Sequence, residues 1–363
     1  MSGKVLNRNP DGSFFKLNFR LEKKSSILIP ASTIERKTPV NMTEGDRSLF
    51  DKEIISTQAS VHLFEYEDAC VTPEGIIFKG LSLDKDLLIY PKHKKIYNSL
   101  YILSSRIKRK KITLSKEETY LLIFDYWSNS VFHWMCDALP RLEAVKEKAK
   151  ECILLLPENL EYAYIHDSLK AYAFKGIVRI PSNAYVKCHH LISPQQITVS
   201  GEINPGNIRA VRSTILEYYK PKFENKFISP NIYISRSKAK YRKILNEEEL
   251  LPVLGKYNFK IIYFEEMDFT EQVECCFHAK NVVSIHGANL TNTVFMQNKG
   301  NVMEFRKDKD PFNHYFYAIA DSIGCNYYYQ DCETIDKRPG YNFFDLNVNV
   351  PLFEENLKRM LGQ

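Results

Sequence analysis

The sequence predicts an α/β protein with two sheets of parallel strands, each covered by helices. Three observations predict this class. Apolar segments of strand length alternate with helical segments from residue 120 to 220, and the alternation starts again near residue 230. The polar, proline-bounded residues 220–230 separate the two runs. At 363 residues, the chain is long enough for two domains of ordinary size.

The composition limits the functional classes. With 44% hydrophobic and 26% charged residues, the chain is typical of globular proteins. Its net charge of +6 is too small for a dedicated nucleic-acid binder, but it suits anionic substrates or weak attraction to anionic lipid. The sequence has no apolar run of about 20 residues and starts without a signal-type segment. The eight cysteines include no C-x-x-C pair, so we expect buried free thiols and a cytoplasmic location.

The N-terminal third has three parts. Residues 1–59 are polar, and we expect a loosely ordered arm with one or two short strands. Residues 60–91 alternate apolar and polar side chains around the turn sequence Pro73-Glu74-Gly75, which predicts a β-meander. Residues 92–117 carry a basic run at 106–111. Such a run is usually a solvated loop or strand edge, and the alternative is contact with an anionic acceptor or a membrane.

The alternating segments follow in order. The first run predicts strands at 120–124, 152–157, 177–180 and 185–192, and helices at 131–150, 159–174 and 204–220. The second run predicts strands at 231–236, 259–264, 282–286, 301–305 and 326–330, and helices at 247–257, 271–280, 289–296, 311–324 and 352–362. Pro140 predicts a kink in the first helix, whereas Asn246 and Thr270 are expected caps. The expected domains are 60–220, with the meander, and 228–335, and the tail 336–363 is expected to pack back on the first domain.

A nucleotide site is predicted near VVSIHGANL. The strand 282–285 ends at His286, Gly287 allows a tight turn, and Ala288 and Asn289 open a helix. Backbone N–H groups and the helix dipole favour an anion at such a place. Glu304 ends the following strand and could accept hydrogen bonds from a ribose diol. The alternative is an ordinary strand–turn–helix with a capping asparagine.

Basic residues gather at the end of the strand NIYISR. Arg236 ends this strand, and Lys238, Lys240, Arg242 and Lys243 follow in the next loop. This loop lies at the same expected sheet edge as the turn HGAN. Because arginine forks match diphosphate oxygens, we expect the two arginines to bind a diphosphate. The alternative is a solvated loop.

A possible acid–base centre lies in FHWMCDALPRL. His133 and Asp137 are four residues apart and therefore share one helix face. A carboxylate close to a histidine could take a proton from an attacking hydroxyl. Trp134 offers a flat face for a sugar ring. The alternative is structural, with His133 bonded to the backbone and Asp137 paired with Arg141.

Two short acidic pairs, at 84–86 and 308–310, have the form that metal-dependent sugar transferases use for Mn²⁺. Matches to so short a pattern occur by chance in charged chains, and Asp84 falls in the expected meander. We therefore expect no metal site there.

The segments FHWMCDALPRL, YISRSKAKYRKILNEEEL and SIHGANLTNTVFM, followed by VMEF, resemble glycosyltransferase family 61 over about residues 60 to 335. The resemblance implies a GT-B fold, in which two Rossmann-like domains face each other across a cleft. It also implies a UDP-sugar donor, inversion at the anomeric carbon, and no metal or other cofactor. Matched by position, the acceptor-side residues are His133, Asp137 and Arg141, and the donor-side residues are Arg236, Arg242, His286, Gly287, Ala288 and Asn289.

The resemblance and the residues together predict an inverting transfer from a UDP-sugar to a glycan acceptor. The acceptor would be a lipid-linked glycan or a surface polysaccharide such as a capsule, with possible peripheral membrane contact and no nucleic-acid partner. The roles predicted from the residues are a general base for Asp137 with His133 orienting or replacing it, acceptor binding for Trp134, diphosphate binding for Arg236, Arg242 and the Gly287 turn, and ribose binding for Glu304. The resemblance alone implies acceptor binding for Arg141. The alternatives are a catalytically silent nucleotide- or sugar-binding subunit of an assembly complex, and a metal-dependent enzyme using Asp84 and Asp86.

Overall fold

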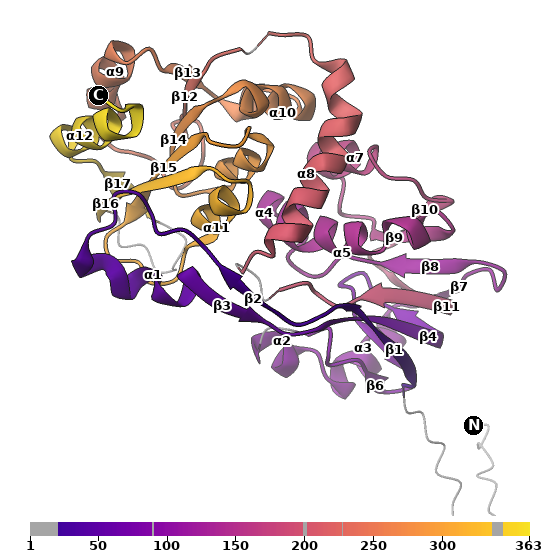
Figure 1. Cartoon of the computed structure of the whole chain (residues 1–363). Helices are drawn as coiled ribbons and strands as arrows, with labels where there is room; N and C mark the ends of the chain where they lie inside the picture. Colours follow the sequence, from indigo (N-terminus) through magenta and orange to yellow (C-terminus); the bar gives the residue numbers. More distant parts are fainter. Residues whose placement is uncertain (1–20, 89–90, 199–201, 227, 336–343) are drawn as a thin grey trace, which may run out of the picture.

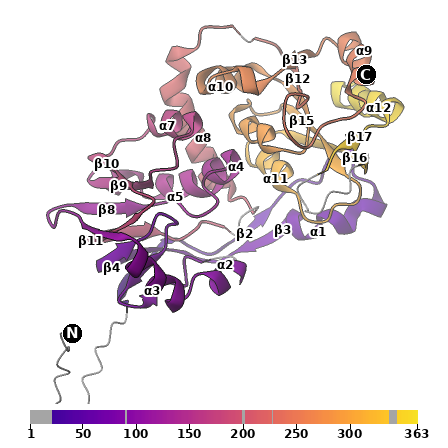
Figure 2. The ribbon, with the colours of Figure 1, turned by 180° about the vertical axis from the view of Figure 1, so that it is seen from behind.

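The computed structural model describes residues 21–88, 91–198, 202–226, 228–335 and 344–363. The chain forms an α/β protein, as predicted. Two sheets with parallel strands lie in separate halves of the molecule, and α8 (Pro205–Tyr219) runs between them (Figure 1). The view from behind shows the same arrangement (Figure 2).

The first sheet joins the expected meander to the expected parallel strands. Within the described residues it has nine strands, in the order β10-β9-β8-β11-β4-β5-β6, with β1 beside β4 and β7 beside β11. Their bounds are β1 Lys23–Ile29, β4 Val61–Val71, β5 Ile77–Lys79, β6 Ser82–Leu83, β7 Lys110–Thr113, β8 Thr119–Leu122, β9 Cys152–Pro157, β10 Gly176–Ile180 and β11 Ala184–Pro194. Strands β7 to β11 are parallel, whereas β4 runs antiparallel to β11 and continues through β5 and β6 as a meander.

The helices of the first half follow the predicted order. They are α2 Pro91–Ile96, α3 Ser99–Lys108, α4 Val131–His133, α5 Leu139–Ala144, α6 Lys146–Ala149 and α7 Ala163–Leu169. A π-helical turn, Trp134–Ala138, separates α4 from α5, and Pro140 lies in the first turn of α5. The predicted break in this helix is therefore confirmed. Helix α8 starts where predicted, because the Asn204 side chain caps it by accepting from the Asn207 N–H.

The second sheet has the order β13-β12-β14-β15-β16-β17 within the described residues. Its bounds are β12 Asn231–Ile234, β13 Lys260–Ile262, β14 Asn281–Ile285, β15 Asn301–Lys307, β16 Asn326–Thr334 and β17 Leu346–Asn347, and its helices are α9 Glu247–Lys256, α10 Phe269–His278, α11 Tyr315–Ser322 and α12 Val350–Leu361. The first five strands of this order are parallel, and β17 is antiparallel to β16. The 3₁₀-helices are η1 Glu44–Asp46, η3 Lys220–Lys222, η4 Phe264–Glu266 and η5 Ala288–Phe295, the last standing where an α-helix was predicted.

Four asparagines lie in register at the starts of the parallel strands. Asn281 donates to the Asn231 side chain (2.7 Å), Asn301 donates to Asn281 (2.7 Å), and Asn326 donates to Asn301 (2.9 Å). These bonds form an asparagine ladder across β12, β14, β15 and β16. Each of these bonds can form only when the neighbouring strands pair in this register, so the ladder stabilises the register. The opposite edge of the sheet remains available for a site.

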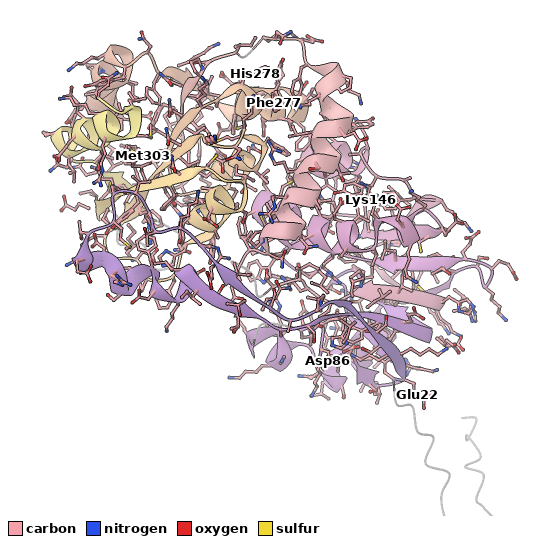
Figure 3. All side chains as sticks on the ribbon, viewed as in Figure 1. Glu22, Asp86, Lys146, Phe277, His278 and Met303 are labelled. Atoms are coloured by element: carbon pink, nitrogen blue, oxygen red, sulfur yellow. The ribbon has the colours of Figure 1, made fainter. Side chains whose placement is uncertain are left out.

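A continuous apolar core links the two halves. It runs from Leu63 in β4 to Tyr329 in β16, and α8 packs against both α5 and α11. At the edge of α8, Lys146 donates to the Thr214 hydroxyl (2.8 Å), and Figure 3 shows Lys146 beside this helix. The halves therefore share one core, and the predicted domain limits at residues 220 and 228 stay a prediction.

The N-terminal segment differs from the expected arm. It contains β2 (Ser32–Glu35), β3 (Ile55–Gln58) and α1 (Arg47–Ile54), and Figure 1 shows it crossing from the first sheet to the second. Phe50 of α1 is fully buried against Tyr317 and Tyr329 of the second half. The segment is ordered because it fills this aromatic pocket. Residues 1–20 lie outside the described residues.

Two further expectations are wrong. The C-terminal helix α12 packs against α9 and β16 of the second half, not against the first, because Phe353 and Leu357 belong to the apolar cluster on that sheet. Helix α10 is capped by Asp268, not Thr270, since the Asp268 side chain accepts from the Glu271 N–H. Residues 336–343 of the expected tail lie outside the described residues.

All eight cysteines are free, and seven are buried, as predicted. Among the described helices, none is both long and apolar enough to cross a membrane.

Candidate functional site

The two halves contact each other where α4 approaches η5 and α11. The Phe132 ring of α4 lies 5.0 Å from the Tyr315 ring of α11. The neighbouring Phe316 ring lies 5.1 Å from His286, which follows β14. A short aromatic chain therefore connects His133, which follows Phe132, with His286 of the second half.

On the first half, His133 and Asp137 form a hydrogen-bonded pair. The distance from His133 Nδ1 to Asp137 Oδ2 is 2.7 Å. The His133 side chain is 21% exposed and that of Asp137 only 4%, so the histidine is the outer member. Asp137 lies in the π-helical turn that follows His133, a local distortion of the kind often found at functional sites. The alternative pairing of Asp137 with Arg141 is not what the structure shows.

Arg141 has a structural role. Its buried guanidinium donates to the backbone oxygens of Pro194 (2.9 Å) and Ile123 (2.6 Å), and to Ser193 Oγ (3.1 Å). These bonds join the ends of β8 and β11, and burial lowers the Arg141 pKa to about 10. The predicted acceptor contact is wrong, because the donors of Arg141 point into the protein.

Trp134 cannot serve as a sugar platform either, because it is fully buried and its Nε1 donates to Ser168 Oγ (2.8 Å). Trp127 and Tyr126 instead present exposed rings close to His133. Trp127 is 37% exposed, and its ring lies 5.6 Å from the His133 ring and 5.3 Å from that of Tyr126. The sequence held a signal for these residues, since their loop follows β8 at the carboxyl edge of the first sheet.

On the second half, Arg236 lies directly against Gly287. A β-carbon on Gly287 would stand 3.1 Å from Arg236 Nη1 and 3.2 Å from Cζ. The guanidinium is held there, since its Nε donates to the Arg242 oxygen (3.3 Å) and its Nη2 to the Tyr241 oxygen (3.2 Å). A side chain at 287 would press on the Arg236 guanidinium, so glycine leaves room for this close approach.

Arg236 and Arg242 have no carboxylate ion partner among the described residues. Burial lowers the pKa of Arg236, and burial together with the Arg236 charge lowers that of Arg242 to about 10. Arg242 Nε and Asn289 Nδ2 are buried, and neither has a hydrogen-bond partner in the described part of the chain. Unpaired buried donors are rare in proteins, so this group is suited to an anion.

Glu304 does not face a ligand. It has no exposed surface, and its two carboxylate oxygens contact His286 Nδ1 and the Tyr327 hydroxyl (2.5 Å to the latter). The predicted ribose contact is therefore wrong for Glu304. Its carboxylate instead orients the His286 ring, and Ala288, the half-buried residue after Gly287, opens η5.

The acidic pair at 84–86 is bound within the protein. Lys23 Nζ lies 2.7 Å from Asp84 and 2.6 Å from Asp86, and the Tyr66 hydroxyl also donates to Asp84 (2.5 Å). Figure 3 places Asp86 at the opposite end of the molecule from Met303 in the second sheet. These carboxylates are therefore not placed to serve the site described above.

Asp310 of the second acidic pair is also bound within the protein. The buried Asp310 accepts from Asn313 (2.6 Å) and from the Phe312 N–H (3.0 Å). Across the described residues, no three His, Cys, Asp or Glu side chains are arranged to hold a metal ion. Whether the protein uses a metal stays a prediction.

The structure is thus an α/β protein with a histidine–carboxylate pair on its first half and two half-buried arginines beside a glycine turn on its second half. Comparison with known proteins is more specific. Residues 131–303 match the model of the family described as Glycosyltransferase 61, from the start of α4 to β15. Over these residues the match confirms the resemblance seen in the motifs.

The chain is also similar to the EGF domain-specific O-linked N-acetylglucosamine transferase of Drosophila melanogaster. The two are 33% identical over 120 residues, which is 31% of this chain and 22% of that protein. This chain therefore spans only a part of that relative.

Proposed function

We propose that the protein is an inverting glycosyltransferase of GT-B type that transfers a sugar from a UDP-sugar to a glycan acceptor. The observation that carries this proposal is the pair Arg236 and Arg242, two half-buried cations without a carboxylate ion partner beside the Gly287 turn. The family match and the named transferase relative support a transferase.

The donor diphosphate is bound by the second half. The two guanidinium groups and the backbone near Gly287 offer positive charge and N–H donors at the carboxyl ends of β12 and β14. When the bond to the sugar breaks, negative charge grows on the diphosphate, and fixed donors stabilise that charge. Asn289 Nδ2 provides a further donor.

The acceptor hydroxyl is activated by the first half. His133 is the outer member of its pair, so its ring takes the proton while Asp137 orients the ring and stabilises its charge. The sequence predicted Asp137 itself as the base. In this arrangement His133 is the base, and Asp137 acts through it. Trp127 and Tyr126 offer faces on which an acceptor sugar stacks.

The acceptor is a glycan in surface polysaccharide or glycoconjugate biosynthesis, which includes glycans held on a lipid carrier. The printed name of the Drosophila relative describes transfer to an EGF domain, and such a protein acceptor remains the other candidate.

A panel of nucleotide sugars tests the proposal. The melting temperature should rise with UDP and with one or a few UDP-sugars more than with GDP- or dTDP-sugars, because a ligand that binds the folded state stabilises it. Incubation with the stabilising donor should release UDP slowly by hydrolysis, and faster when a glycan acceptor is added. Stabilisation without any UDP release would instead indicate the silent binding subunit. Absence of stabilisation by every nucleotide would reject donor binding.

A further inference from the structure

The helices α2 and α3 carry apolar side chains on the outside of the molecule. Leu100 and Ile107 of α3 are each 75% exposed, Leu103 is 43% exposed, and Ile96 at the end of α2 is 49% exposed. With spacings of three and four, the three α3 residues share one helix face. We call Ile96, Leu100, Leu103 and Ile107 the apolar stripe.

The opposite face of α3 anchors the helix to the protein. Ile102 is fully buried in a small cluster with Phe78 and Tyr185. The Tyr101 hydroxyl donates to Glu74 (2.5 Å), which also pairs with Arg109. The stripe is therefore held outward on a fixed helix, and its exposure is not that of a loose segment.

The segment that carries the stripe is strongly basic. Residues 91–113 contain eight lysines and arginines and no aspartate or glutamate, so their formal charge is +8. Because the whole chain carries +6, the other 340 residues together carry −2. Apart from Arg109, the cations of this segment are all exposed, namely Lys92, Lys94, Lys95, Arg106, Lys108, Lys110 and Lys111.

We propose that the apolar stripe and the surrounding cations form a docking surface for an anionic lipid bilayer. An interfacial helix places apolar side chains at the boundary of headgroups and acyl chains, while cations on its flanks bind anionic headgroups. The charge of +8 is complementary to such a surface. It opposes a second copy of this chain, which would bring the same charge, and a nucleic acid offers no apolar phase for Leu100 and Ile107.

The docking surface adjoins the candidate site through α2. His93 of α2 stacks on Trp127 with ring centroids 5.8 Å apart, and Trp127 lies beside His133. Docking itself does not depend on the proposed function. If the proposed function holds, a bilayer at this surface keeps a lipid-carried glycan within reach of the acceptor side.

Vesicle sedimentation of the full chain tests the proposal. The vesicles contain phosphatidylcholine alone or with 30% phosphatidylglycerol, at low and high NaCl. The protein should bind the anionic vesicles at low salt, bind them more weakly at high salt, and not bind the neutral vesicles, because screening weakens surface attraction.

Variants separate the two parts of the surface. L100S/I107S should lower the partition coefficient on anionic vesicles by tenfold or more, whereas L251S/L352S, at exposed leucines of α9 and α12, should change it by less than about twofold. K108A/K110A/K111A should lower it by roughly tenfold to a hundredfold, and K52A/K116A/K358A should have little effect. Circular dichroism and melting temperature check that each variant is folded.

Three results would overturn the proposal. The first is a lack of binding to anionic vesicles by the folded wild type. The second is equal binding by wild type and L100S/I107S, which would leave only an electrostatic contact. The third is a dimer in sedimentation velocity that L100S/I107S dissociates, since the stripe would then be a contact between copies.

Discussion

At the scale of single residues, Arg242 is held in an unfavourable state. Its backbone has a φ of 58°, in the left-handed region that residues other than glycine and asparagine rarely adopt. Its guanidinium is partly buried and lies near the like charge of Arg236. Burial and this like charge together lower its pKa. Neither feature helps the ligand-free protein to fold. Such cost at one position is typical of binding sites, where the ligand supplies the missing partner.

Arg242→Asn tests this account. Asparagine tolerates the left-handed conformation and removes the charge, so the ligand-free variant should melt at the same temperature as wild type or a few degrees higher. The stabilisation by UDP should be largely lost. Lys240→Asn, an exposed change in the same loop, should keep it. A strongly destabilised Arg242→Asn with normal UDP stabilisation would assign Arg242 to the fold.

Among the elements, the second sheet carries its stabilising side-chain bonds and its candidate site at opposite edges. The asparagine ladder lies at the starts of the parallel strands, whereas Arg236, His286 and Gly287 follow their carboxyl ends. Loops at the carboxyl ends of parallel strands are the usual place for ligands in such sheets. One edge thus fixes the register, and the other edge positions the site.

Asn281→Ala should show the contribution of the ladder. The change removes two side-chain hydrogen bonds and leaves Asn231 and Asn301 each without one partner. The free energy of unfolding should fall by about 1–3 kcal/mol, as expected for unsatisfied polar groups. Asn326→Ala, at the exposed end of the ladder, should cost less than about 1 kcal/mol. Equal small losses in urea titrations of both variants would contradict the role of the ladder.

The order of elements and the motif residues could be predicted from the sequence, because strand and helix periods and strand-end positions are local features. The direction in which a side chain points could not be predicted. Trp134 and Trp127 both follow β8, but the π-helical turn directs Trp134 into the core and leaves Trp127 exposed. The roles of Arg141 and Glu304 depended on partners distant in sequence, such as Pro194 and Tyr327, which no local pattern indicates.

At the scale of the whole molecule, the N-terminal segment ties the two sheets together. Phe50 of α1 packs against His314, with ring centroids 4.7 Å apart, and against Arg306. Arg306 Nη1 donates to His314 Nδ1 (3.2 Å), which requires an unprotonated nitrogen there. Burial and the Arg306 charge lower the His314 pKa to about 4.

This histidine should make the stability of the protein depend on pH. Between pH 6.5 and about 4, the unfolded chain binds a proton at His314 and the folded chain does not, so stability falls as the pH falls. The loss approaches about 3 kcal/mol at pH 4. In His314→Gln, melting temperatures at pH 7.5 and 5 should differ less than in wild type. His190→Gln, at an exposed histidine, should behave as wild type, and an unchanged pH dependence in His314→Gln would contradict the account.

In the proposed mechanism, the first half activates the acceptor while the second half binds the donor diphosphate. The most direct test measures both the UDP dissociation constant and the transfer turnover in Asp137→Asn. The amide is nearly isosteric, and Asp137 lies in the half opposite Arg236, so the dissociation constant should stay within about threefold of wild type. Turnover should fall by roughly two to four orders of magnitude, the usual contribution of an oriented general base. A folded Asp137→Asn variant that transfers sugar at nearly the wild-type rate would contradict the claim.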